Sequence, residues 1–100
     1  MAVKVLITRH LKEGKIQDAY ALLGELRGEA LKYSGYISGE TLIGYQDPRT
    51  LVVAATWDSL DSWRKWRDAP QRQGIDKKMQ ALLTEPAKYE EFLLGAYLPR

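Results

Sequence analysis

Two basic side chains at the end of the first predicted strand are the first candidates for chemistry. His10 is the only histidine of the chain, and its ordinary pKa of about 6.5 suits a general base at neutral pH. Arg9 precedes it and can donate hydrogen bonds to an oxyanion. Because successive strand residues point to opposite faces, only one of the two can enter a pocket beneath a sheet. The alternative for His10 is a surface position at the strand end.

Aromatic residues form the second candidate group. Enough aromatic surface to line a flat apolar pocket comes from Trp57, Trp63 and Trp66 together with Tyr20, Tyr36 and Tyr45. Such a pocket would suit a polycyclic phenol or quinol, and we predict that Tyr20, Tyr36, Trp57 and Trp63 bind it. For any single tryptophan, the alternative is ordinary core packing against the second predicted helix.

Metal and nucleic-acid sites are poorly supported. With one histidine and no cysteine, a metal would depend on carboxylates, and the neighbours Glu90 and Glu91 point apart on a strand. A basic cluster consists of Arg64, Lys65, Arg67, Arg72, Lys77 and Lys78, with Asp61, Asp68 and Asp76 among them. This mixture of signs indicates a solvated helix face. We therefore expect no metal and no nucleic-acid partner.

Length and composition predict a single compact domain over residues 1–100. The chain is 45% hydrophobic and 28% charged, as is usual for a globular protein. No apolar run approaches the roughly 18 residues that span a bilayer, and no signal-peptide core follows the first methionine. The lack of cysteine fits a reducing compartment. We expect a cytoplasmic protein with no membrane partner.

Hydrophobic periodicity predicts the order strand, helix, strand, strand, helix, strand. Strands are expected over residues 3–11, 36–45, 50–57 and 89–98, and helices over 15–33 and 58–84, with an interruption at Pro70. Gly35 should take a left-handed conformation after the first helix. Asp47 and Pro48 should form a hairpin turn. Asp58 or Ser59 should cap the second helix.

This order predicts an α+β, ferredoxin-like βαββαβ fold, with a four-stranded antiparallel sheet and helices on one face. Strands one, three and four carry apolar residues at both alternating positions. The uncovered face would then expose several apolar side chains together. We predict a homodimer in which two sheets pack face to face, with a ligand-covered face as the alternative. Whether the last strand pairs within its own subunit or is exchanged stays open.

Four short segments, in this order and spacing, resemble the antibiotic biosynthesis monooxygenase family. They are SGYISGETL at residues 34–42, the turn at Asp47 and Pro48, TWDSL at residues 56–60, and Trp66 with Arg67. The resemblance extends over residues 3–83. It implies the ferredoxin-like fold, a dimeric α/β barrel made of two sheets, and a pocket between each sheet and its own helices.

The family's chemistry is varied. It includes oxygenases that oxidise quinols or polyketide anthrones without metal or flavin, haem-degrading enzymes, and proteins without a known activity. In the haem-degrading branch, an Asn on the first strand, a Trp on the second helix and a later His form the site. Trp66 matches that Trp, whereas Arg9 falls near the Asn position and Asp76 falls where the axial His would be. The resemblance therefore favours chemistry without haem or another cofactor.

The resemblance implies a cofactor-independent monooxygenase that uses dioxygen on a small aromatic, quinol or polyketide-like substrate. The substrate is deprotonated and its electron-rich anion reduces dioxygen, so the protein needs a base, an oxyanion donor and a dry cavity. His10 or Asp76 is the candidate base, and Arg9, Tyr36 or Trp66 is the candidate donor. The alternative is a non-catalytic small-molecule-binding or stress-related dimer of the same fold.

Overall fold

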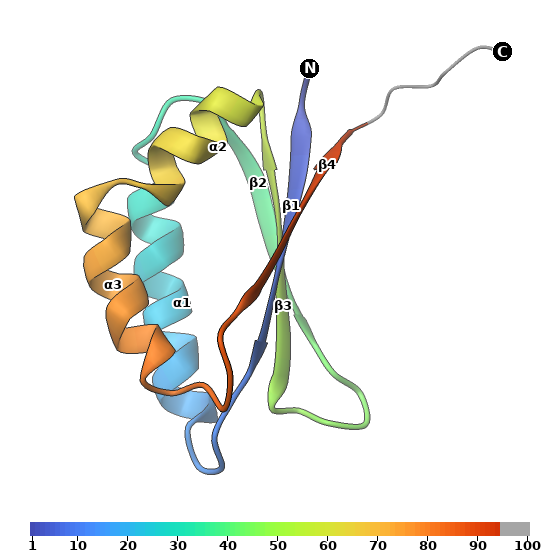
Figure 1. The fold of residues 1–100 in the computed structure, drawn as a ribbon, viewed down its shortest axis with the longest axis vertical. Coiled ribbons are helices and arrows are strands. Elements are labelled where there is room, and N and C mark those ends of the chain that lie inside the picture. Colours follow the sequence, from blue (N-terminus) through green and yellow to red (C-terminus); the bar gives the residue numbers. More distant parts are fainter. Residues whose placement is uncertain (95–100) are drawn as a thin grey trace, which may run out of the picture.

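A computed structural model describes residues 1–94 as a four-stranded sheet with three helices. In chain order the elements are β1 (Val3–His10), α1 (Ile16–Ala30), β2 (Tyr36–Ile43), β3 (Thr50–Trp57), α2 (Leu60–Arg67), α3 (Pro70–Gln80) and β4 (Lys88–Leu93). The strands are antiparallel in the order β2-β3-β1-β4. All three helices cover the same face of the sheet (Figure 1). This arrangement confirms the predicted α+β, ferredoxin-like fold.

Local signals in the sequence place the second helical region. Ser59 caps α2, because its hydroxyl accepts a hydrogen bond from the amide of Ser62 at 3.1 Å. Pro70 begins α3, a position where the missing amide hydrogen is not needed. Gly35 has a φ of 95°, and a Cβ there would overlap Ser62 and Asp58. The predicted cap, interruption and left-handed glycine are confirmed.

Several elements are shorter than the periodicity predicts. α1 ends at Ala30 because the amides of Lys32 and Tyr33 donate to carbonyls three residues earlier, which is the tighter hydrogen-bond pattern of a 3₁₀ turn. β2 ends at Ile43, where the amide of Gly44 starts the hairpin loop by donating to Thr50 at 2.9 Å. Positions 95–98 of the predicted last strand lie outside the described residues.

The two faces of the sheet differ in character. On β1 the side chains of Val3, Val5, Ile7 and Arg9 are buried beneath the helices, whereas Lys4, Leu6, Thr8 and His10 lie on the uncovered face. The strand register places Lys88, Glu90 and Phe92 of β4 on that same face. The prediction of apolar residues at both alternating positions of strands one and four is therefore only partly right. The uncovered face is a mixed apolar and polar surface.

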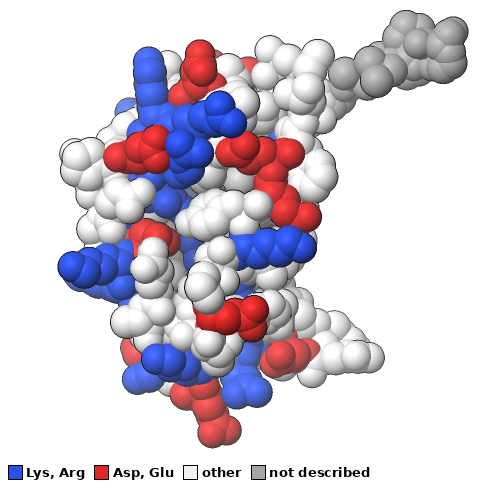
Figure 2. Space-filling model, viewed as in Figure 1, with Lys and Arg blue, Asp and Glu red and all other residues white. Residues whose placement is uncertain are grey.

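Charges of both signs alternate over the surface seen in Figure 2. Arg67 pairs with Asp68 at 2.8 Å, and Arg64 lies 3.5 Å from Glu91. The prediction of a solvated helix face is correct for these residues of the cluster. It is wrong for Arg72 and Asp76, which are buried. Within residues 1–94, no helix combines the length and the apolarity that crossing a bilayer requires.

Candidate functional site

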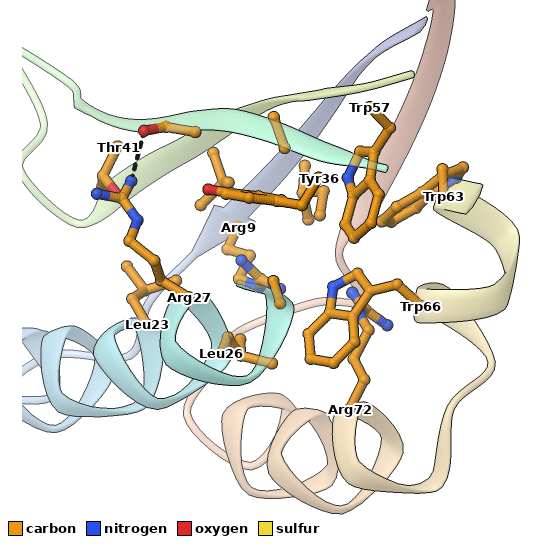
Figure 3. Close-up of a pocket in the computed structure, with 15 residues that line it drawn as sticks. Arg9, Leu23, Leu26, Arg27, Tyr36, Thr41, Trp57, Trp63, Trp66 and Arg72 are labelled. Atoms are coloured by element: carbon orange, nitrogen blue, oxygen red, sulfur yellow. Dashed lines mark hydrogen bonds between the residues drawn. The ribbon is translucent and has the colours of Figure 1, made fainter. Parts of the chain in front are cut away.

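A cavity of about 60 Å³ lies between the sheet and its helices. Its walls come from β1, β2 and β3 on one side and from the three helices on the other, as Figure 3 shows. The lining residues are Ile7, Arg9, Leu23, Leu26, Arg27, Ala30, Tyr36, Gly39, Thr41, Val53, Ala55, Trp57, Trp63, Trp66 and Arg72. The pocket that the family resemblance implies thus has a counterpart in this fold.

Aromatic rings form one end of the cavity. Tyr36 meets Trp57 edge-on with ring centroids 5.2 Å apart, and Trp63 follows at 6.3 Å from Trp57. Trp66 stacks obliquely on Tyr33 at 4.9 Å. The ring of Trp63 is fixed because its indole nitrogen donates to Glu91 at 2.6 Å. Four of the predicted aromatic residues therefore line one cavity.

The two other tyrosines that we singled out do not line this cavity. Tyr20 lines a separate groove on the surface between α1 and β2. Tyr45 follows β2 in the hairpin loop and is 99% exposed.

Arg9 is the most unusual residue of the site, since its long charged side chain is only 1% exposed. Its Nε and Nη2 atoms are buried and have no hydrogen-bond partner within residues 1–94. Asp76 Oδ1 lies 3.7 Å from Nη2, close enough for an ion pair and too far for a good hydrogen bond. Burial lowers the pKa of Arg9, and the nearby Tyr89 and Asp76 oppose this effect.

Trp57 supplies a third N–H donor, its Nε1, that is buried and makes no hydrogen bond within residues 1–94. Figure 3 shows this nitrogen on the side of the indole that faces Tyr36. Buried donors are normally satisfied, because an unsatisfied one costs about 1–3 kcal/mol. All three unsatisfied side-chain donors of residues 1–94 belong to residues that line the cavity.

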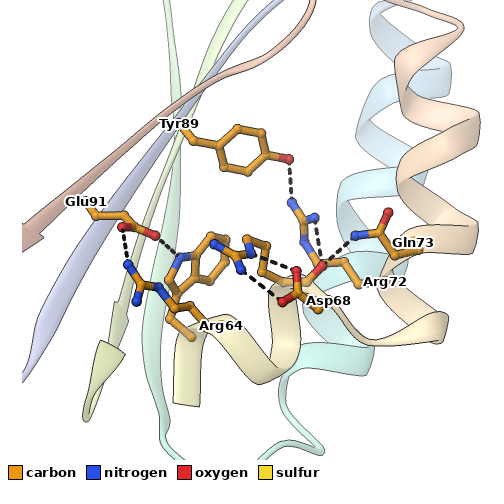
Figure 4. A network of polar contacts seen from close by, with 8 residues as sticks. Arg64, Asp68, Arg72, Gln73, Tyr89 and Glu91 are labelled. Atoms are coloured by element: carbon orange, nitrogen blue, oxygen red, sulfur yellow. Dashed lines mark hydrogen bonds and ion pairs between the residues drawn. The ribbon is translucent and has the colours of Figure 1, made fainter. Parts of the chain in front are cut away.

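Arg72 brings a second guanidinium to the cavity. It is 2% exposed and donates to the Tyr89 hydroxyl at 2.7 Å (Figure 4). Its guanidinium carbon lies 5.6 Å from the ring centre of Trp63. These partners are neutral. The sequence analysis missed its burial, although a signal existed: Arg72 and Asp76 precede the apolar Met79 at helical spacing and so share its face.

Asp76 stands behind Arg9 and does not line the cavity. Its Oδ1 faces Arg9, and its Oδ2 accepts a hydrogen bond from Gln80 at 2.8 Å. It also borders a separate surface pocket between the end of α3 and β4. The structure brings together Arg9 and Asp76, which were predicted separately as candidate donor and candidate base, with Asp76 as the counter-ion of Arg9.

His10 lies on the uncovered face of the sheet. Its Nδ1 is 3.2 Å from the hydroxyl of Thr50 on β3. The helices cover the opposite face, so His10 is separated from the cavity by the sheet itself. Of the two basic residues at the end of β1, Arg9 is the one that enters the pocket.

Arg27 closes the other end of the cavity. Its side chain reaches from α1 to the edge strand β2 and donates to the Gly39 carbonyl at 2.7 Å, opposite the tryptophans (Figure 3). Beyond it is the groove of about 300 Å³ that Tyr20 borders, with Leu23, Gly24, Arg27, Thr41 and Ile43. Because Leu23, Arg27 and Thr41 border both spaces, Arg27 marks the boundary between them. No sequence motif indicated this role.

The charges around the cavity do not balance. Arg9 and Arg72 are buried cations, and Asp76 is the one buried carboxylate within residues 1–94. No histidine or carboxylate lines the cavity, and no group of three potential metal ligands occurs in this part of the chain. The cavity therefore presents hydrogen-bond donors and positive charge, which is an environment for an anion or an oxygen acceptor.

Fold and cavity together define a ferredoxin-like domain with an aromatic, electropositive pocket beneath its sheet. Residues 2–78 match the sequence profile of the antibiotic biosynthesis monooxygenase family. The chain belongs to this family, as the segments quoted from the sequence indicated. No curated protein sequence matches it at a significant level.

Solved structures share the fold at low sequence identity. A conserved protein from Methanosarcina mazei Go1 is 20% identical with a TM-score of 0.87, covering 92% of this chain and 91% of its own. SnoaB, a cofactor-independent oxygenase from Streptomyces nogalater, is 16% identical with a TM-score of 0.85, over 99% and 98% of the two chains. A Mycobacterium tuberculosis protein is 18% identical with a TM-score of 0.83, over 100% and 98%. These similarities agree with the ferredoxin-like fold of the described residues.

Proposed function

We propose that this protein is a cofactor-independent monooxygenase that oxidises a small aromatic phenol or quinol with dioxygen. One observation carries the proposal: an aromatic cavity lined by residues with three buried N–H donors, two on Arg9 and one on Trp57, that have no hydrogen-bond partner within residues 1–94. A phenolate or quinol oxygen is an acceptor that would satisfy them. Membership of a monooxygenase family and the similarity to SnoaB support the same reading.

The proposed reaction balances without an added reductant. A quinol and one dioxygen give a hydroxyquinone and one water, so that one oxygen atom enters the ring and the other leaves as water. All four electrons come from the substrate, and its displaced hydrogens form the water. The protein must bind the substrate as an anion, exclude bulk water and admit dioxygen.

The cavity favours the anion by its charge. We assign Arg9 and Trp57 as donors to the substrate oxygen, and Arg72 as a second positive charge nearby. Opposite charge within a few ångström lowers the pKa of a phenol. Tyr36 and Trp66 shape the cavity and exclude water. Asp76 holds Arg9 in place and is a positioning residue in this scheme.

The absence of a base supports the second candidate function, a non-catalytic protein that binds a small aromatic molecule. His10 lies on the opposite face of the sheet, Asp76 lies behind Arg9, and no other histidine or carboxylate lines the cavity within residues 1–94. Such a protein would bind the same phenols and consume no oxygen.

Homodimerisation through the uncovered sheet face is part of the proposal. Leu6, Leu42, Val52 and Phe92 lie on this face, and helices cover only the other one (Figure 1). Packing two such faces together would bury these side chains.

The test is oxygen uptake by protein freed of metals with a chelator, using a panel of quinols and anthrones. Uptake of one dioxygen per substrate, with no hydrogen peroxide detected by added catalase, is expected. Trp57→Phe removes one donor and keeps an aromatic side chain, so it should lower the rate, while His10→Ala should not. Tight binding of the same compounds without uptake would replace the oxygenase with the binding protein.

A further inference from the structure

The cavity and the outer groove differ in size and in chemistry. The cavity measures about 60 Å³ and carries the buried arginines, whereas the groove measures about 300 Å³. A cavity of roughly 150 Å³ is known to admit benzene in another protein. The inner space alone is therefore too small for an aromatic ring with its substituents. A ligand must place a small group inside and its larger part toward the groove.

The charges around the cavity favour a ligand group with a negative charge. The described chain buries two guanidinium groups, Arg9 and Arg72, and a single carboxylate, Asp76, which lies 3.7 Å from Arg9. Buried charges are normally paired. The adjacent Nε and Nη2 groups of Arg9 make no hydrogen bond within residues 1–94, although Asp76 lies 3.7 Å from Nη2. A guanidinium edge of this kind matches the two oxygens of a carboxylate.

The outer groove is apolar on both of its walls. Leu23 on α1 and Ile43 on β2 provide its aliphatic surface, and Tyr20 adds a ring. Arg27 is bound to the Gly39 carbonyl only by an exposed hydrogen bond, which is a weak restraint. Rotation of this one side chain would join the two spaces.

We infer that the ligand is a hydroxylated aromatic acid: its carboxylate supplies the oxygens that Arg9 binds, Trp57 remains the donor to its hydroxyl oxygen, and its ring system extends past Arg27 into the groove. This inference rests on the proposed function for its site and names the substrate class more closely. Neutral quinols would then be poorer ligands than hydroxylated aromatic acids.

The experiment is calorimetric titration under nitrogen, so that no oxidation accompanies binding. The probes are 3-hydroxy-2-naphthoate and its neutral counterpart 2-naphthol, with salicylate as the one-ring acid. A charge-assisted hydrogen bond predicts that the naphthoate binds at least about tenfold more tightly than naphthol. Equal affinities on the unaltered protein would overturn the inference and need no variant.

Variants test the two halves of the ligand separately. Arg9→Gln with Asp76→Asn removes both charges together, so neither is left buried and unpaired. The preference for the acid should fall below about threefold in this double variant. A preference that survives it would place the carboxylate elsewhere.

A substitution in the groove can be compared with a matched control substitution on the same strand. Ile43 and Leu42 are exposed to the same degree, but they lie on opposite faces of β2. Ile43→Ser should weaken the naphthoate several-fold and leave salicylate unchanged, while Leu42→Ser should alter neither. Equal effects of the two substitutions would overturn the placement of the ring system.

The outcomes separate this inference from the proposed function. Oxygen uptake on neutral quinols without any preference for acids would remove the inference alone. Tight, Arg9-dependent binding of the acid with no uptake of oxygen on any probe would remove the oxygenase and keep the acid site.

Discussion

Asp76→Asn tests whether Arg9 carries a buried charge that depends on one carboxylate. The two groups are 3.7 Å apart, with side chains 1% and 7% exposed. At an effective dielectric constant of about 20, Coulomb's law gives about 4 kcal/mol for this pair. Asparagine keeps the shape and part of the dipole, so the expected loss in the free energy of unfolding is about 3 kcal/mol, the lower range for a broken buried pair.

The assay is urea unfolding followed by tryptophan fluorescence, and thermal unfolding. For a domain of this size the loss should lower the melting temperature by more than about 12 °C. Asp68→Asn is the matched control, because Asp68 makes its ion pair with Arg67 at the surface, and its midpoint should move far less. A loss for Asp76→Asn no larger than that of the control would refute a desolvated pair.

Three further predictions concern other parts of the molecule. Gly39→Ala should lower the free energy of unfolding by roughly 1–3 kcal/mol and weaken ligand binding, because its Cβ would come within 2.6 Å of the Tyr36 hydroxyl. Gly28→Ala, on open helix surface, should raise the free energy of unfolding by roughly 0.4–1 kcal/mol. Urea unfolding measures both changes, and calorimetry measures the binding. Val52→Glu on the uncovered face should convert a dimer into the 11.4 kDa monomer by light scattering, and a dimer that persists would exclude this face. Arg67→Gln should raise the pKa of Asp68 in an NMR titration, since the hydrogen bond from Arg67 lowers that pKa. A pKa that is lower in the folded state stabilises the fold at pH values above the unfolded-state pKa, and this contribution disappears as the pH falls through the folded-state pKa. An unchanged pKa would contradict the pair.

The fold could be predicted because its signals are local. Alternation of apolar residues identified β1 and β3, and Ser59, Pro70 and Gly35 marked the turns and caps. Element ends were less accurate. The amides after α1 donate to carbonyls three residues back in the helix, and the Gly44 amide after β2 donates to Thr50 at the start of β3. Those backbone hydrogen bonds depend on the folded structure and leave no pattern in the sequence.

The site was predictable in its aromatic part and not in its charged part. Strand parity showed that Arg9 and His10 must separate, and the helices decided which one is buried. Arg72 looked like one more basic residue of a solvated helix, although its helical spacing to the apolar Met79 placed it on the buried face of α3. Arg27 meets Gly39 across a gap that sequence periodicity does not describe.

The most direct measurement is oxygen consumption by the metal-free protein with hydroxylated aromatic acids and neutral quinols, compared with Trp57→Phe and His10→Ala. The account predicts one dioxygen consumed per substrate, a lower rate in Trp57→Phe and an unchanged rate in His10→Ala. No consumption with any substrate that binds, or a loss of activity only in His10→Ala, would contradict an oxygenase site in the cavity beneath the sheet.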